Sequence, residues 1–260
     1  MLYDPLEIFT SGIVLSNILY LFIFLVLLSI ISSLIGFAIE KSNFGKRHKI
    51  FEKPLKPNQL KNEFHSSIMF VLINAIVISA GLQSGWINFS ADSLFSFFYT
   101  FFIHYLLFEI WYYIIHRSMH SPAFFRFHKK HHDSIVTTPL TGLSMSSTES
   151  MIWALGYIGI PVLMSFFLPL NFYAWFVFLI YHWSGNILGH INAEIIPSFT
   201  ATKLGSLFLH PFSYHSLHHA RGKGHFALYA GVLDRIFKTE FDDWISQYHE
   251  IQKGNPITKI

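Results

Sequence analysis

The sequence predicts an all-α integral membrane protein with four to five transmembrane or re-entrant helices and a cytosolic, histidine-rich cap. Hydrophobic residues make up 52% of its 260 residues and charged residues only 13%, which is too apolar for a soluble domain of this length. Uncharged stretches long enough to cross a bilayer recur along the chain, and most histidines lie in clusters just beyond them. We therefore expect a helical bundle with the histidines gathered at one end.

Two long uncharged stretches predict the first two spans. A helix needs about 20 apolar residues to cross the roughly 30 Å hydrocarbon core of a bilayer. Residues 13–38 are rich in Leu, Ile and Phe, and residues 66–86 form a second uncharged stretch that contains small residues. We interpret the first stretch as a retained anchor, because no basic residue precedes it and no small-residue cleavage site follows it.

The remaining apolar stretches supply the other helices. Residues 94–115 are broken by a single acid, Glu109, and lead directly into the first histidine pair. Residues 150–192 contain no Asp, Glu, Lys or Arg, which is enough for two crossings separated by Pro169 and Asn171, or for a shallow re-entrant hairpin. No linker, low-complexity tract or repeat interrupts the chain, so we predict one membrane domain over residues 1–260.

The distribution of basic residues predicts the orientation. Lys and Arg are dense in residues 41–61, absent from residues 86–93, and return in residues 117–130 and after the last apolar stretch. Because basic residues concentrate in cytosolic loops, an N-terminus outside places every histidine cluster on the cytosolic side. We expect a multi-pass protein of a bacterial inner membrane or of the endoplasmic reticulum.

The histidine clusters have helical spacing. His116 and His120 are four residues apart, so on a helix that continues the third span both rings point the same way. Residues 128–132 and 215–219 share the pattern His-x-x-His-His, and Asn186 precedes His190 by four residues. The clustered histidines are His116, His120, His128, His131, His132, His190, His215, His218 and His219.

This number of imidazoles predicts a dinuclear metal centre. Imidazole suits iron and similar metals, and two ions with four or five ligands each would need about eight to ten such groups. The chain contains no cysteine, which excludes disulfides, thiolate zinc sites and iron–sulfur clusters. Two irons would together supply electrons to O₂, while the protein would position the substrate and exclude water.

The boxes HRSMH, HKKHH and HSLHH, with NILGH between the last two, resemble those of the fatty acid hydroxylase / sterol desaturase superfamily. The likeness runs over residues 108–239, within a hydroxylase-like region of about residues 94–240. It includes FEIWYYIIHRSMH at the first box, and Asp234 to Phe237 with Thr239, which resemble the family's Asp-Arg-x-x-x-Thr signature. The resemblance implies that the nine clustered histidines are the metal ligands.

Two positions depart from the family pattern. Asn186 stands where some members have a histidine; it could bind a metal directly, act through a water molecule or orient His190, and of these we favour the water. Residues 145–148 replace a His-Pro pair that many members have before the acid matching Glu149, which we expect to alter a substrate-facing loop. Glu109 shares a helical face with His116, and we expect its carboxylate to accept the outer N–H of a ligand imidazole. The alternative is an interfacial residue whose carboxylate extends toward water.

The other histidines and acids receive weaker assignments. We expect surface or structural roles for His48, His65, His104 and His249. Candidates for contact with the outer side of the centre are His182, His210, His225, Asp133, Glu194 and Asp234.

The predicted function is O₂-dependent hydroxylation of an unactivated C–H bond in a fatty-acyl, sterol or related membrane lipid, with desaturation by the same two-iron centre as the alternative. Electrons are expected from NAD(P)H through a separate protein, ferredoxin or cytochrome b₅ with a reductase. An acidic donor of this kind has a candidate docking surface at Lys129, Lys130, Arg221 and Lys223. The Phe-rich spans offer an apolar groove for the lipid.

Functions of other classes fit less well. A zinc hydrolase would need a motif such as His-Glu-x-x-His, which the sequence lacks. A histidine-rich metal transporter is the stronger rival, but its ligands would lie near the bilayer midplane rather than beyond the helix ends. A membrane scaffold would leave the clusters without a role, and a nucleic-acid partner is not expected because the basic residues are not interleaved with a stacking surface.

Overall fold

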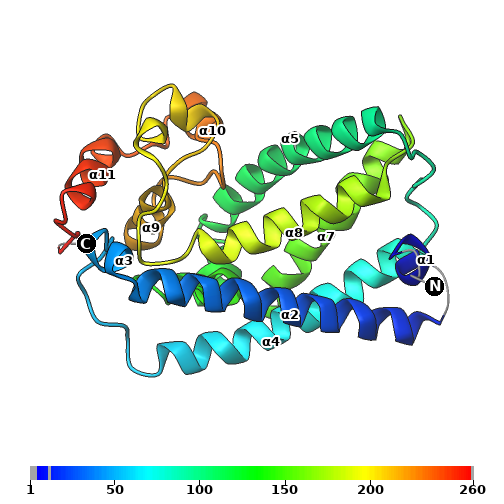
Figure 1. Cartoon of the computed structure of the whole chain (residues 1–260), viewed down its shortest axis with the longest axis horizontal. Coiled ribbons are helices and arrows are strands. Elements are labelled where there is room, and N and C mark those ends of the chain that lie inside the picture. The colour runs from blue at the N-terminus through cyan, green and yellow to red at the C-terminus, as the bar shows by residue number, and fades with distance from the viewer. Residues whose placement is uncertain (1–4, 11–12, 259–260) are drawn as a thin grey trace.

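The described part of the chain is helical throughout. The computed structural model describes residues 5–10 and 13–258, and within these ranges every regular element is a helix (Figure 1). Strand-like pairing there is limited to two isolated bridges, Lys49 with Ala193 and Phe51 with Ile257. The predicted all-α fold is confirmed. The ends of the predicted domain, residues 1–4 and 259–260, lie outside the described residues, as do residues 11–12.

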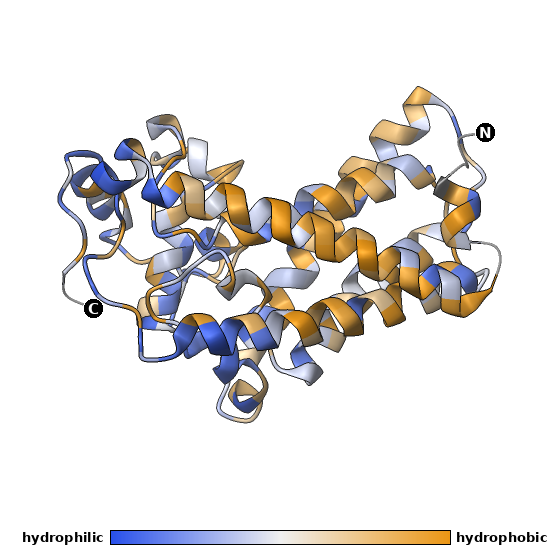
Figure 2. Ribbon diagram, turned by 60° about the horizontal axis from the view of Figure 1, so that its bottom comes forward, coloured by the Kyte–Doolittle hydropathy of each residue, from blue (hydrophilic) through white to orange (hydrophobic). Residues whose placement is uncertain are grey.

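Five long helices form the bundle. α2 (Val14–Lys41), α4 (Gln59–Gln83) and α5 (Leu94–Met119) are each long and apolar enough to cross a membrane. The shorter α7 (Ser147–Ser165) packs against α4 and α5, and α8 (Phe172–Leu188) packs against α2 and α5. All of the predicted apolar stretches are therefore helices of one integral membrane bundle. Figure 2 shows hydrophobic residues along these helices and hydrophilic residues at the end that holds the C-terminus.

Polar residues cap the helices where the sequence turns apolar. The side chain of Ser93 accepts the N–H of Ser96 at the start of α5, and the side chain of Asn171 accepts the N–H of Ala174 at the start of α8, both at 3.1 Å. These caps satisfy N–H groups that the first helical turn leaves without partners. Between α7 and α8, the N–H of Leu170 donates to the carbonyl of Asn88 at 2.7 Å, which joins this loop to the loop between α4 and α5.

A cap of short helices covers the opposite end, where α2, α5 and α8 finish (Figure 1). Its core joins α9 to α11 through the buried side chains of Tyr214, Trp244 and Tyr248. The short helix α1 (Pro5–Thr10) lies at the end away from the cap. The elements at the cap end are α3 (Asn43–Arg47), α6 (Phe125–His132), η1 (Thr141–Leu143), η2 (Ser198–Thr200), η3 (Gly205–Leu207), α9 (Phe212–Arg221), α10 (Val232–Ile236) and α11 (Trp244–Gln252).

Candidate metal centre

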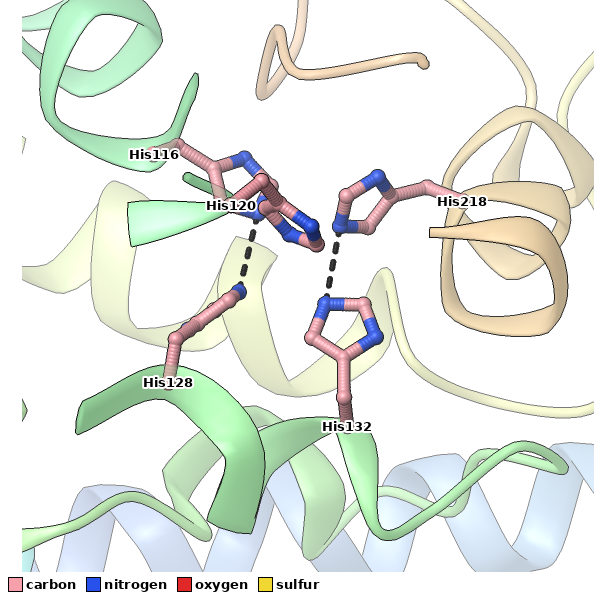
Figure 3. Close-up of side chains that lie close together, drawn as sticks. All are labelled: His116, His120, His128, His132 and His218. Atoms are coloured by element: carbon pink, nitrogen blue, oxygen red, sulfur yellow. Dashed lines mark hydrogen bonds between the residues drawn. The ribbon is translucent and has the colours of Figure 1, made fainter. Parts of the chain in front are cut away.

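The nine clustered histidines converge at the cap end in two groups. In each group, one ring nitrogen per residue lies within 4.8 Å of those of all the other members. Figure 3 shows the rings of the first group pointing toward one another. The five-histidine group contains His116, His120, His128, His132 and His218, and the four-histidine group contains His131, His190, His215 and His219.

Helical periodicity explains how each His-x-x-His-His box contributes rings to both groups. On α6, His128 and His132 are four residues apart and join the five-histidine group, while His131 joins the other. On α9 the assignment is reversed, since His215 and His219 join the four-histidine group and His218 joins the first. Each His-x-x-His-His box therefore lies between two ligand sets.

Hydrogen bonds on the outer ring nitrogens fix the direction of the lone pairs. A carbonyl oxygen can only accept, so a ring whose Nδ1 contacts a carbonyl carries its proton there and leaves Nε2 as a lone pair. Four rings are held in this way: His116 by Phe226 O at 2.8 Å, His218 by Gly224 O at 2.7 Å, His219 by Ser134 O at 3.0 Å, and His190 by Asn186 O at 2.5 Å.

The inward-facing nitrogens fit a bound metal. His128 donates its Nδ1–H to Glu149 Oε1 at 2.6 Å, so its Nε2 is also a lone pair, and it lies 3.1 Å from Nε2 of His116. Buried Nε2 atoms of His120 and His219 have no hydrogen-bond partner in the described residues. Facing lone pairs and buried unpaired acceptors are unfavourable unless a cation lies between them.

The surroundings keep the cap histidines neutral. Burial, reinforced by the neighbouring rings, lowers the pKa of His132 to about 3, and burial lowers the pKa of His190 to about 4. The same causes hold the pKa values of His131, His215 and His218 well below their ordinary value. Neutral imidazole is the form that binds metals, so these rings need no deprotonation at neutral pH.

The acid that contacts a clustered imidazole in the described residues is Glu149, whereas the contacts of Glu109 are to backbone groups. Among the described residues, Glu109 Oε2 accepts the backbone N–H groups of Tyr229 at 3.3 Å and Ala230 at 3.1 Å. It therefore fixes the segment after the last box rather than a ring. Glu149 reaches His128 from α7, because Ser146 caps that helix and its hydroxyl also donates to the carbonyl of Phe127 on α6.

Asn186 contacts the four-histidine group through its backbone. Its carbonyl accepts from His190, and its side-chain amide donates to the carbonyl of Gly142 in η1. A Cβ at Gly142 would lie 2.7 Å from the carbonyl oxygen of Asn186 and 3.1 Å from Nδ1 of His190, so this close approach requires glycine. The water-mediated role of Asn186 stays a prediction.

Sequence reasoning missed Glu63, which supports the four-histidine group from α4. Its buried carboxylate accepts from the side chains of Gln59 at 2.9 Å, Ser134 at 2.6 Å, Thr138 at 2.6 Å and Thr141 at 2.7 Å. The carbonyl of Ser134 in turn holds His219, and Thr141 precedes Gly142. The available signal was the density of hydroxyl residues in 134–148, which need an acceptor when buried.

Asp234 supports the five-histidine group. Its carboxylate accepts from the backbone N–H of Phe226 at 2.8 Å and of Ala227 at 2.9 Å, and from the hydroxyl of Thr239 at 2.6 Å. Because the carbonyl of Phe226 holds His116, the Asp-Arg-x-x-x-Thr signature positions a clustered ring.

Of the other candidates, some make structural contacts and one lies beside the four-histidine group. His225 is structural, since Nδ1 donates to Tyr214 O at 2.8 Å and Nε2 accepts from Phe241 N at 2.9 Å. Glu194 accepts the N–H of Ser213 at 2.7 Å and so holds the start of α9. His182 contacts Tyr157 inside the bundle, Asp133 is exposed, and His210 lines a cavity of about 30 Å³ that also touches His190 and His215. His48, His65, His104 and His249 belong to neither group.

The fold and the site define a class: a helical membrane protein that carries two buried histidine groups suited to metal ions at one end of its bundle. A family model described as fatty acid hydroxylase matches residues 101–239, which is more than half of the chain and includes all nine histidines. The chain therefore belongs to the fatty acid hydroxylase family.

Several curated proteins are similar to this chain. Protein CER1-like 2 of Arabidopsis thaliana is 33% identical over 135 residues, which cover 50% of this chain and 22% of that protein. Very-long-chain aldehyde decarbonylase GL1-6 of Oryza sativa subsp. japonica is 28% identical over 209 residues, covering 74% and 31%. Very-long-chain aldehyde decarbonylase GL1-7 of the same subspecies is 27% identical over 225 residues, covering 82% and 34%. The chain thus spans at most about a third of these relatives, and no solved structure matches it.

Proposed function

We propose that this protein is a di-iron oxygenase that hydroxylates an unactivated C–H bond of a membrane lipid. Membership of the fatty acid hydroxylase family and two buried histidine groups support an enzyme that modifies lipids with a bound metal. The observation that carries the proposal is the division of nine imidazoles into five and four, which is a ligand set for two ions rather than one.

Two irons bound at these groups would supply the activation of O₂. The overall reaction consumes the lipid C–H bond, O₂, two electrons and two protons, and yields an alcohol and water. The electrons would come from NAD(P)H through a separate ferredoxin, or through cytochrome b₅ with a reductase. On this proposal the nine box histidines are the ligands and the cap faces the cytosol.

The protein's own groups have defined parts in this scheme. Backbone carbonyls and Glu149 hold the outer ring nitrogens, so that the lone pairs stay directed inward while the ions are absent or changing. Every ring of the four-histidine group is buried, which limits the access of water to that group and would protect a reactive oxidant from side reactions. The cavity beside His190 and His215 is lined largely by apolar side chains, which suits the hydrocarbon part of a lipid.

A long-chain aldehyde is the second candidate substrate. Several similar proteins are named very-long-chain aldehyde decarbonylases, and the longest match with one of them covers 82% of this chain. The metal ions held by the same histidine groups would then support cleavage of the bond between the carbonyl carbon and the chain, with the aldehyde hydrogen passing to the chain and carbon monoxide leaving. Desaturation of a lipid is a third outcome available to the same two-iron centre.

The test is metal analysis followed by product analysis. Purified protein in lipid nanodiscs should contain two irons per chain and should consume NAD(P)H in an O₂-dependent manner when an electron donor is added. Mass spectrometry then separates the outcomes: a gain of one oxygen indicates hydroxylation, a loss of two hydrogens desaturation, and a hydrocarbon one carbon shorter than an added aldehyde indicates decarbonylation. Metal flux into liposomes without lipid turnover would instead favour a transporter.

A further inference from the structure

An exposed apolar edge projects from the cap. Large exposed hydrophobic side chains are ordinary when single, but a group of them marks an interaction surface. Here they occur in two neighbouring segments, 199–208 and 236–237. The apolar edge consists of Phe199, Leu204, Phe208, Ile236 and Phe237, whose exposed fractions are 63%, 71%, 74%, 63% and 52%.

The two segments form one unit. Arg235 Nη2 donates to the hydroxyl of Ser206 at 2.9 Å, and the N–H of Gly231 donates to the carbonyl of Ser206 at 2.8 Å. Ser206 is fully buried between them. The exposed side chains are therefore held on a common base rather than on independent loops.

The apolar edge continues the lipid-facing surface of α5. The ring of Phe237 stacks on Tyr113 of α5 with 5.4 Å between centroids, and Ile110 and Ile114 of the same helix are exposed. Lys203 precedes Leu204 and Lys238 follows Phe237, and both lysines are exposed. Apolar side chains flanked by lysines are typical of segments that lie in the headgroup region of a bilayer.

Behind the apolar edge lies the small cavity at the four-histidine group. Leu209 follows the exposed Phe208 and lines the cavity, whose other walls include Leu228, His190 and His215. A volume of about 30 Å³ admits the reacting part of a chain and not a whole lipid. The rest of the substrate must therefore extend outward.

Tyr229 closes the cavity toward the bundle. Its hydroxyl donates to the carbonyl of His182 at 3.2 Å, and a Cβ added to Gly185 would lie 2.4 Å from that hydroxyl oxygen. The half-exposed Tyr181 packs on the outer side, with 5.2 Å between its ring centroid and that of Tyr229. This aromatic pair therefore lies between the cavity and the exposed surface at Tyr181.

We propose that the apolar edge lies within the leaflet next to the cap, and that a lipid acyl chain passes from this leaflet between Leu209 and Tyr229 to the four-histidine group. The path rests on the proposed function in that it delivers a lipid substrate to the candidate centre. The immersion of the edge is a property of the fold, so it is tested without any measurement of turnover.

Spin labelling tests the immersion. Because the chain has no cysteine, Phe208→Cys, Phe237→Cys and Lys253→Cys each give a single labelling site, and Lys253 is an exposed side chain of the cap. In nanodiscs of phosphatidylcholine and phosphatidylglycerol, nitroxides at 208 and 237 should collide mainly with O₂, and the nitroxide at 253 mainly with a water-soluble nickel chelate. Equal nickel accessibility at all three positions would overturn the immersion.

Photo-labelling tests the path. A palmitic acid with a mid-chain diazirine should label Leu228 and Tyr229, which are only 6% and 9% exposed and so are out of reach of bulk lipid. Leu209→Trp should remove these buried adducts and retain adducts at Phe208. Adducts confined to exposed residues, or to the separate apolar groove of about 420 Å³ between α2 and α4, would overturn the path. Labelling of the cavity in a protein that lacks hydroxylase activity would sustain the path and refute only the proposed reaction.

Discussion

The two histidine groups share α6 and α9 but have different surroundings. In the five-histidine group, His120 and His132 are only partly buried, and Glu149 contacts one of the rings. In the four-histidine group every ring is buried, and a small cavity touches His190 and His215. On the proposed function, we therefore expect electrons to reach the centre from the side of the five-histidine group and the lipid to reach it from the side of the four-histidine group.

The strongest test of two separate sites removes one ring from each group. His218→Ala and His131→Ala should each reduce the iron content from two ions per chain toward one and bring turnover to background. Each loss should exceed the roughly 10- to 100-fold effect typical of residues that only support a ligand. Iron analysis and lipid product analysis of nanodisc preparations measure both effects.

His65→Ala is the matched control for these variants, because His65 is exposed on α4 and belongs to neither group. It should retain both ions and full turnover. The yield in the membrane fraction should be similar for all three variants, because none of the residues lies in an apolar span interior. Full iron content in His131→Ala would remove that residue from the ligand set.

A change at Glu149 should act on the five-histidine group alone. Glu149→Gln keeps the shape of the side chain but replaces the carboxyl group that accepts from His128 Nδ1 by an amide with a single acceptor oxygen, so we expect metal affinity to fall by roughly 10- to 100-fold at that group. Titration of metal-free protein with Fe²⁺ should resolve one weakened and one unchanged site. Glu109→Gln is the control, since its contacts are backbone N–H groups of Tyr229 and Ala230, and it should leave both affinities unchanged.

Glu149 and Glu109 also show which contacts of the site cannot be predicted from the sequence. The helical spacing of the boxes brought all nine histidines to one end, because ligands at i, i+3 and i+4 of one helix are local. The partner of His128, in contrast, comes from another helix, whereas Glu109, which spacing along α5 favoured, contacts backbone N–H groups. Whether a carboxylate reaches a ring depends on how α6 and α7 pack, which no period in the sequence encodes.

The same contrast between local pattern and packing explains why the bundle helices were predicted and Glu63 was not. Apolar length predicted each bundle helix, since a helix that crosses lipid must satisfy its own backbone. The contacts of Glu63 join residues more than 70 positions apart and arise only when α4 lies beside the 134–144 loop. Glu63 also lies outside the residues that the family model matches.

Glu63 offers a change confined to the four-histidine group. In Glu63→Gln, one carboxylate oxygen becomes an NH₂ group that cannot accept, so either the hydrogen bonds from Ser134 and Thr141, which share Oε1, or the hydrogen bond from Thr138 to Oε2 is lost. We expect iron affinity at the four-histidine group to fall by about 10-fold, at the low end for supporting residues, with the other group unchanged. Mössbauer spectra of ⁵⁷Fe-loaded protein would report which of the two iron environments has changed.

Glu52→Gln is the control for Glu63, because Glu52 is an exposed acid whose carboxylate pairs with Lys49 at 3.2 Å. It should leave both iron environments as they are. Equal weakening of the two groups in Glu63→Gln would mean that Glu63 stabilises the whole cap rather than positioning one ligand set.

The smallest expected effect concerns the entry of electrons. Of the four basic residues predicted to dock an acidic donor, Arg221 is already engaged, since its guanidinium makes two hydrogen bonds to the Asp243 carboxylate at 2.6 and 2.7 Å. Lys129 and Lys130 stay exposed on α6, the helix that serves both groups. Their replacement by Glu should raise the KM for a ferredoxin or cytochrome b₅ donor several-fold at low salt. The effect should fade above about 0.1 M salt, where the Debye length is about 10 Å.

Turnover driven by a small uncharged reductant should not change, because the lysines lie outside both ligand groups. An unaltered KM for the protein donor at low salt would place the electron entry elsewhere on the cap and break the proposed division between the two groups.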